Sequence, residues 1–206
     1  YIPGAVAFIA RKGKIVYYKS FGYDDIEKKT PLKKDQIFRI ASQTKAITSI
    51  AALMLYEEGK YNLDDPVSKF IPEFKNPVIL KTFNEKDSSY ITEPAKKEIT
   101  IRQLFTHTSG IGYAGIGTKE MNAIYAKAGV PSGVGNSNGV LSEKMKILGK
   151  LPLMHEPGEK FTYGLNTDLL GYLVELWSGM SLDEFFRKRI FIPLGMNDTS
   201  FYLPEN

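Results

Sequence analysis

Residues 38–58 constrain the fold of this chain more than any other stretch. Apolar side chains recur there at helical spacing, and further small or apolar residues fill the gaps. The positions are Ile47, Ile50, Ala51, Met54 and Leu55, with Ala46, Ala52 and Leu53 between them. A helix that is apolar nearly all round is typical of a protein interior. We therefore expect a central, buried helix, which Gly59 is placed to end.

Ser42 and Lys45 lie three residues apart at the start of this expected helix. Three residues are close to one helical turn, so both side chains leave the same face. A serine hydroxyl needs a base beside it to act as a nucleophile, and a lysine can serve if burial or a nearby cation keeps it neutral. The free N–H groups of the first helical turn would hold a developing oxyanion.

The spacing alone does not establish this chemistry. A chain of this serine and lysine content contains about one Ser-x-x-Lys match by chance. The alternative is an N-terminal serine cap followed by a solvated lysine. A lysine at the start of a buried helix is less usual, since structural lysines lie at surfaces. On the local pattern, both interpretations stand.

Composition excludes several classes of function. The 206 residues include no cysteine and two histidines, His107 and His155, which argues against disulfides, a thiol nucleophile and a multi-histidine metal site. The net charge of +4 is mild and no basic helix carries interleaved aromatics, so nucleic-acid binding is not expected. Gly133, Gly135 and Gly139 follow no strand, so we expect no dinucleotide cofactor. No apolar run approaches a membrane span.

Strands are expected only at the start of the chain. Residues 5–10 and 15–18 are β-rich runs joined by residues 11–14, which predicts a hairpin. Helices are expected around residues 64–67, after a capping box at 100–103, and at 141–148, 167–177 and 182–190. Residues 76–97 are predicted to be irregular, and residues 112–139 a long loop containing some helix. A lone hairpin is marginally stable, so further strands are expected outside this sequence.

Five stretches, in order along the chain, resemble one family. They are residues 3–7, 38–45, 104–110, 157–163 and 193–199. They look like the opening strand, the nucleophile motif, the L-L-x-H-T-S-G segment, the approach to the second catalytic motif and the P-L-G-M-x-x-T segment of the serine β-lactamase and penicillin-binding-protein superfamily. The resemblance is to the N-terminal portion of its class C-like and carboxylesterase-like branch.

The resemblance implies an α+β fold, in which an antiparallel sheet with flanking helices adjoins an all-helical lobe. Residues 1–35 would supply the N-terminal strands of the α/β lobe, and residues 36–206 the nucleophile helix and the helical lobe of one domain. On this resemblance, we expect the C-terminal strands of the fold to lie outside this sequence. We expect the C-terminal remainder of the protein, possibly as a separate chain, to pair with the hairpin edge.

The resemblance also implies the catalytic residues. Ser42 would be the acyl-accepting nucleophile, Lys45 its base or proton relay, and Tyr163 the second base and later the acid to the leaving group. From the residues alone, Tyr163 would be taken as a core tyrosine hydrogen-bonded at its tip. The Ser42 N–H and a second N–H, from a strand absent from this sequence, would hold the oxyanion.

The first of two departures from the family pattern concerns a substrate contact. The second motif is usually Y-x-N, whose Asn contacts the substrate amide in lactam- and peptide-directed relatives. Here Leu165 takes that place and Asn166 comes one position late. We assign both to substrate binding, and the leucine favours an ester over an amide. Asp168 would point into the site or be an ordinary helix residue, and we favour the latter.

The third motif of the family, commonly K-T-G, H-x-G or W-x-G, has no clear counterpart. Residues 177–179 match W-x-G by letters, but they end an expected helix, where glycine is a normal stop. We therefore treat this match as a decoy. His107 is expected to be a structural residue of a loop under the site.

The expected function is that of a serine hydrolase that forms an acyl-enzyme with small esters or amides, with a carboxylesterase favoured. The alternatives are a β-lactamase or D-amino-acid peptidase and, in another class, a non-hydrolytic penicillin-recognising sensor or inactive binding module. We expect a periplasmic or extracellular location, with the cytoplasm left open. The chain begins within a strand entry, which is compatible with the removal of an upstream segment.

Overall fold

The computed structural model describes residues 2–131 and 139–202 of the chain. The chain divides into two compact units, Tyr1–Ile40 and Ala41–Asn206. The expected division of one domain into strands at residues 1–35 and a helical part at residues 36–206 stays a prediction. Gly133 and Gly135, which we weighed as part of a dinucleotide motif, lie outside the described residues.

The first unit is a small antiparallel sheet with strand order β1-β2-β3. Its strands are β1 (Gly4–Arg11), β2 (Lys14–Asp25) and β3 (Thr30–Pro31). Lys12 and Gly13 join β1 to β2 with φ angles of 50° and 72°, as a tight two-residue hairpin turn requires. The predicted hairpin is therefore confirmed, with longer strands than expected and a short third strand.

The second unit is mostly helical. Its helices are η1 (Ala41–Gln43), α1 (Thr44–Glu57), η2 (Val67–Lys69), η3 (Pro72–Phe74), α2 (Ile101–Phe105), α3 (Lys119–Lys127), α4 (Leu141–Leu148), α5 (Asn166–Ser178), α6 (Leu182–Phe186), η4 (Arg187–Phe191) and α7 (Ile192–Leu194). The expected helix at 141–148 is confirmed, and so are the capping box of Thr100 with Gln103 and the stop of α5 at Gly179.

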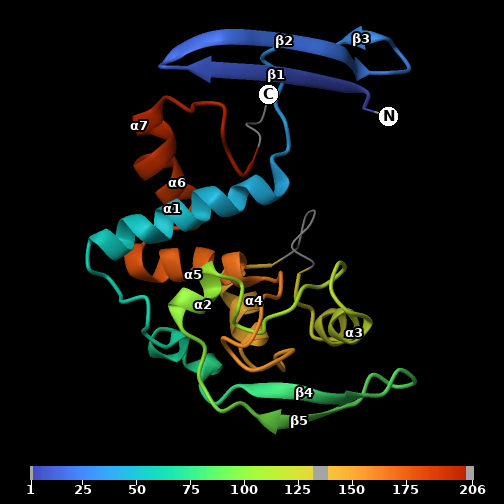
Figure 1. The fold of residues 1–206 in the computed structure, drawn as a ribbon, viewed down its shortest axis with the longest axis vertical. Helices are drawn as coiled ribbons and strands as arrows, with labels where there is room; N and C mark the ends of the chain where they lie inside the picture. The colour runs from blue at the N-terminus through green and yellow to red at the C-terminus, as the bar shows by residue number, and fades with distance from the viewer. Residues whose placement is uncertain (1, 132–138, 203–206) are drawn as a thin grey trace. The chain divides into compact units, whose positions relative to one another are not determined.

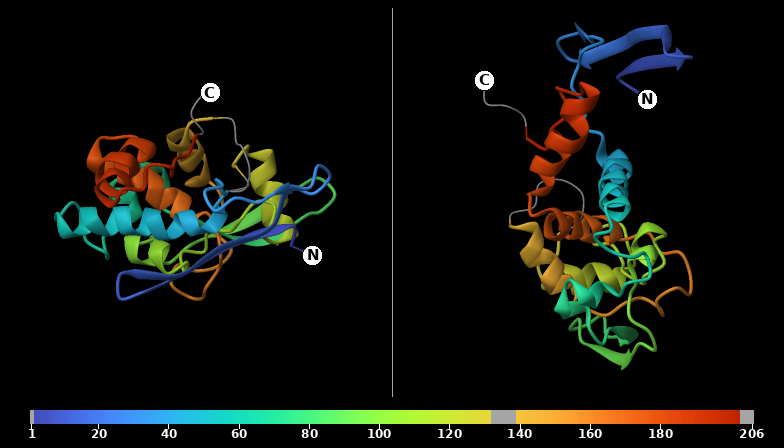
Figure 2. Two further views of the ribbon diagram at one scale, coloured as in Figure 1. Left: turned by 90° about the horizontal axis from the view of Figure 1, so that it is seen from above. Right: turned by 90° about the vertical axis from the view of Figure 1, so that its left-hand side faces the viewer.

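Helix α5 is the centre of this unit. It packs against α1, α2, α4 and α6 (Figure 1), and Figure 2 shows its contact with α1 from two other sides. By contrast, α1 buries only one face, formed by Thr48, Ala51, Ala52 and Leu55. Ile50 and Leu53 remain 52% and 43% exposed. Within the second unit, α5 therefore takes the central place that we expected of the helix after Ser42.

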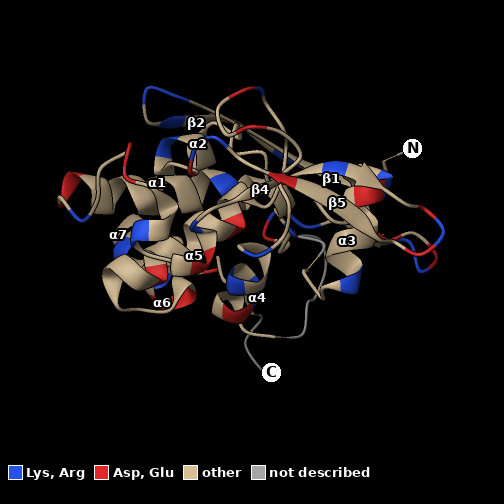
Figure 3. Ribbon diagram, turned by 90° about the horizontal axis from the view of Figure 1, so that it is seen from below, with Lys and Arg blue, Asp and Glu red and all other residues tan. Residues whose placement is uncertain are grey.

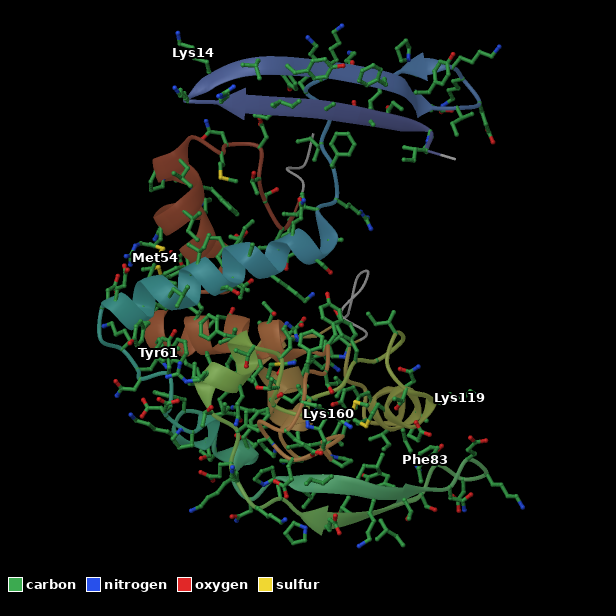
Figure 4. All side chains as sticks on the ribbon, viewed as in Figure 1. Lys14, Met54, Tyr61, Phe83, Lys119 and Lys160 are labelled. Carbon is green, nitrogen blue, oxygen red and sulfur yellow. The ribbon has the colours of Figure 1, made fainter. Side chains whose placement is uncertain are left out.

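Contacts at both ends hold α1 and α5 side by side in the same direction. Ser42 and Tyr163, which precede the first turns of the two helices, are hydrogen-bonded to each other. Beyond the other end of α1, the Tyr61 ring labelled in Figure 4 stacks on Trp177 near the end of α5, with centroids 3.9 Å apart. Trp177 thus lies a helix length of about 20 Å from the start of α5. The W-x-G letters are far from Ser42, as expected of a decoy.

A second hairpin corrects the prediction that residues 76–97 are irregular. Strands β4 (Val78–Phe83) and β5 (Tyr90–Pro94) pair antiparallel, and Leu153 forms a parallel bridge with Ile79. Valine, isoleucine, threonine and aromatic residues favour strands, and both segments are rich in them.

Charged residues of both signs are interspersed along the ribbon (Figure 3). None of the helices in the described part of the chain is both long and apolar enough to cross a membrane.

The segment before α5 approaches the backbone after α2 so closely that it requires a glycine. A Cβ at Gly164 would lie 2.0 Å from the carbonyl oxygen of Ile111. We predict that Gly164→Ala lowers the free energy of unfolding by about 1–3 kcal/mol, because rigid backbone must move. Chemical denaturation measures this change.

Gly171→Ala is the matched control. Its Cβ would meet the side-chain tip of Leu182 at 3.0 Å, which can shift, and alanine favours the helix. We expect a change within about 1 kcal/mol. Equal losses in the two variants would contradict the close backbone approach.

Candidate active site

Ser42 lies in the 3₁₀ turn that leads into α1. The preceding residue, Ala41, has a φ of 44°, a left-handed conformation that is strained for a non-glycine residue. The N-cap of α1 is Gln43, and its side chain makes no capping bond. Ser42 therefore does not act as the helix cap that we considered as the alternative. Its hydroxyl instead makes two side-chain contacts.

The three residues implied to be catalytic come together around the Ser42 hydroxyl. Ser42 Oγ lies 2.9 Å from Tyr163 Oη and 3.4 Å from Lys45 Nζ. Lys45 Nζ also lies 4.9 Å from the centroid of the Tyr163 ring. Ser42 and Tyr163 are exposed and Lys45 is half-buried, so a small molecule can reach the hydroxyl. This arrangement suits attack by the hydroxyl on a carbonyl carbon.

A second tyrosine, which the sequence did not indicate, borders this cluster. Tyr113 is 2% exposed and stacks on Tyr163 with centroids 5.4 Å apart and planes inclined by 13°. Lys45 Nζ lies 5.7 Å from its ring centroid. Tyr113 closely follows the segment that resembles L-L-x-H-T-S-G. This position in the sequence is the signal that could have indicated that Tyr113 lies near the site.

The charges of the cluster favour a protonated Lys45 beside a Tyr163 whose pKa is lowered. Burial lowers the pKa of Lys45, but a hydrogen bond with Tyr163 and the charges of Tyr113, Tyr163 and Asp168 outweigh burial and raise it. The pKa of Tyr163 is lowered, first by its hydrogen bond with Lys45 and then by that with Ser42. Both shifts describe one interaction, in which a cation stabilises a phenolate.

Asp168 is a further charged neighbour of the cluster. It lies in the first turn of α5, and its charge acts on Lys45, Tyr113 and Tyr163. Burial raises the pKa of its carboxyl to about 6, although the Lys45 charge opposes this. Asp168 is thus an acidic first-turn residue of α5, as expected, and its charge also reaches the cluster, which a helix pattern does not reveal.

The two residues expected to bind substrate lie beneath the surface. Leu165 and Asn166 are both 0% exposed. The side-chain oxygen of Asn166 accepts a hydrogen bond from Ser109 Oγ at 2.5 Å, and its nitrogen lies 3.1 Å from His107 Nδ1. These bonds favour a structural role for Asn166, which shapes the loop that carries Tyr163.

The described residues also form a hollow away from this cluster. An open hollow of about 750 Å³ lies between β5 and residues 154–160, and none of Ser42, Lys45 and Tyr163 lines it. Within residues 2–131 and 139–202, no three His, Asp or Glu side chains are grouped to hold a metal ion.

Comparisons with known proteins show the family of this chain. The family model described as Beta-lactamase matches residues 1–206. The chain is 34% identical to Esterase EstB of Burkholderia gladioli over 204 residues, which are 99% of this chain and 48% of that protein. It is 37% identical to Acyltransferase calJ of Penicillium decumbens over 188 residues, which are 90% of this chain and 43% of that protein.

A solved structure is similar as well. The structure of EstCE1, described as a hydrolase with promiscuous acyltransferase activity, superposes with a TM-score of 0.79 and 32% identity. The match covers 98% of this chain and 49% of that one. The chain thus spans about half the length of the relatives it matches.

The Asp168 carboxyl makes stability depend on pH. Its pKa is about 6 in the folded protein against 3.8 ordinarily, so the folded state holds this proton more tightly. Its contribution to stability is full below pH 3.8 and is lost as pH rises through 6. We predict that Asp168→Asn removes this loss, which amounts to about 3 kcal/mol. Unfolding of both proteins by urea at pH 4 to 7.5 measures it, and parallel stability profiles would contradict it.

Proposed function

Because this chain belongs to the Beta-lactamase family, we propose that it supplies the nucleophile of a serine hydrolase that works through an acyl-enzyme. The observation that carries the proposal is the position of Ser42 Oγ, 2.9 Å from Tyr163 Oη and 3.4 Å from Lys45 Nζ. A serine with both a proton acceptor and a cation at its hydroxyl is equipped for nucleophilic attack.

In the first half of the proposed reaction, Ser42 attacks the carbonyl carbon of the substrate and its proton passes to Tyr163 Oη. The Lys45 ammonium stabilises the phenolate that accepts this proton. As the tetrahedral intermediate collapses, Tyr163 returns the proton to the leaving alcohol or amine. Ser42 is then acylated and Tyr163 is again ready to accept a proton.

The second half repeats these steps with water in place of serine. Tyr163 takes a proton from water, the hydroxide attacks the ester carbonyl of the acyl-enzyme, and the proton returns to Ser42 Oγ. A neutral Lys45 acting as the base is the other assignment that the resemblance allows. The raised pKa of Lys45 and the lowered pKa of Tyr163 support the tyrosine.

Acyl transfer to an alcohol is the second candidate function. It differs only in the acceptor, because an alcohol replaces water in the second half. The relatives named as an acyltransferase and as a hydrolase with promiscuous acyltransferase activity support it. A rise in the yield of butyl ester when butanol is added to the reaction would identify this activity.

We further propose that the third motif belongs to the rest of the protein, on the same or a separate chain. The chain spans about half of its relatives, and among the described residues the W-x-G letters lie at the far end of α5 from Ser42. The sheet of the first unit would extend by pairing with strands of that remainder.

Single substitutions test the proposed roles. With p-nitrophenyl butyrate, the wild type should release nitrophenolate and gain one butyryl group by mass. We predict that Ser42→Ala abolishes both and that Tyr163→Phe slows acylation by about 10²–10⁴-fold. Lys45→Met fits a half-buried helix position and should slow acylation by about 100-fold without unfolding the protein.

Circular dichroism of each variant provides the control for folding. Wild-type turnover in a folded Ser42→Ala protein would overturn the proposal. Stoichiometric labelling without turnover would instead support the non-hydrolytic sensor.

In relatives that act on lactams or peptides, an asparagine at the Leu165 position contacts the substrate amide. Leu165 is apolar and buried, so it offers no such contact, and we predict a preference for esters. A polar contact missing from a site can change discrimination by orders of magnitude. We expect kcat/KM for p-nitrophenyl acetate or butyrate to exceed that for a chromogenic cephalosporin by at least about 100-fold. Steady-state kinetics on the two substrates decide the point, and similar values would contradict the assignment to esters.

A further inference from the structure

His107 holds an unusual backbone conformation directly after α2. Its φ of 54° lies in the left-handed region, which costs a non-glycine residue roughly 1–2 kcal/mol. Such a conformation persists only where surrounding contacts compensate for it. Here His107 N donates to the Leu104 carbonyl oxygen of α2, and the remaining hydrogen bonds come from the segment that carries Tyr163.

Three hydrogen bonds join His107 to this segment on both sides of Tyr163. The carbonyl oxygen of His107 accepts from Thr162 N at 2.7 Å. Its Nδ1 lies 3.4 Å from Gly164 N and 3.1 Å from Asn166 Nδ2. The His107 ring also stacks on the Tyr163 ring, with centroids 5.2 Å apart and planes inclined by 19°. One residue thus holds both the backbone and the ring of Tyr163.

The hydrogen bonds also assign the tautomer of His107. Ser109 Oγ accepts from Ile111 N, so its proton is free to go to Asn166 Oδ1. Gly164 N can only donate, and it points at His107 Nδ1, so Nδ1 is an acceptor and the Asn166 group that faces it is the amide nitrogen. An Nδ1 that accepts leaves the ring proton on Nε2, and the imidazole is neutral. Burial and the Lys45 charge agree, because they lower the pKa of His107.

Protonation would break this arrangement. A proton on Nδ1 would point at two N–H donors and would place a second cation near Lys45. Among the described residues, the Lys45 charge of α1 acts on His107, and the Tyr163 ring stacks on it. Tyr113 and Asp168 act in turn on Lys45. His155 lies on the far side of Thr162, where its Nε2 is 2.7 Å from the Thr162 hydroxyl.

We propose that His107 is a positioning residue, which as a neutral Nε2–H imidazole fixes the ring and backbone of Tyr163 for proton transfer and loosens them when it is protonated. This inference rests on the function proposed for Tyr163. It makes His107 more than a structural loop residue, because the state of its ring governs the proton-transfer tyrosine.

Two substitutions test separately the stacked ring of His107 and its Nδ1 acceptor. His107→Asn keeps an acceptor at the δ position and tolerates a positive φ, but it removes the stacked ring. His107→Phe keeps a flat ring and removes the acceptor. We expect each to lower kcat for p-nitrophenyl butyrate by about 10- to 100-fold, with KM changed less than about threefold. His155→Asn is the matched control, since it removes a buried histidine bonded to the same segment without touching the Tyr163 ring, and its kcat should stay near wild type.

Nuclear magnetic resonance makes the test independent of turnover. In wild type at pH 7, the ¹⁵N shifts of His107 should show the neutral Nε2–H tautomer. The Tyr163 signal of protein labelled at tyrosine ¹³Cζ, assigned with Tyr163→Phe, should titrate below pH 10.0, and in both His107 variants it should move up toward that value. The decrease of kcat at acidic pH should follow the titration of His107, and it should persist in Asp168→Asn.

Each outcome decides the inference. An Nδ1–H or charged His107 at pH 7, or folded variants whose Tyr163 titration and kcat match wild type, would overturn it. If both variants fail to fold, two measurements still test the inference. They are the tautomer of His107 in wild type and the decrease of kcat at acidic pH in Asp168→Asn. Absence of any Ser42-dependent acylation in wild type would refute the proposed function. The Tyr163 titrations would still test whether His107 positions Tyr163.

Discussion

The parallel packing of α1 against α5 is the constraint on which the site depends. Ser42 and Lys45 come from the start of α1, and Tyr163 comes directly before α5, so the distance between the two helices sets the distance between their reacting groups. The stack of Tyr61 on Trp177 holds the other end of the same pair. Because α5 also contacts α2, the loop that follows α2 lies under Tyr163 and brings His107 to it.

Sequence patterns predicted the local features that short-range physics determines. The spacing of Ser42 and Lys45, the capping box at Thr100 and the glycine stop after α5 depend only on neighbouring residues, and all three appear in the structure. The β4–β5 hairpin was missed although its residues favour strands. Polar residues in its turn and on either side of it made the whole segment look irregular.

The burial of α1 and the role of Asp168 were not predictable in this way. Periodicity reports how apolar a helix is, not which neighbours cover it, and here α5 takes the central place. Asp168 looks like any acidic residue in a first helical turn, and its raised pKa arises from tertiary burial. The assignment of Leu165 and Asn166 to substrate binding came from the family pattern, which does not show that both side chains point inward.

The central claim is that Tyr163 receives the serine proton while Lys45 stays charged. Titration of the Lys45 signal in protein labelled at lysine ¹³Cε, assigned with Lys45→Met, tests it most directly. The account predicts that Lys45 loses its proton above the ordinary lysine value of 10.5, and only after Tyr163 has lost its own. A Lys45 that is already neutral near pH 7 to 8, below the Tyr163 transition, would contradict the account and make the lysine the base.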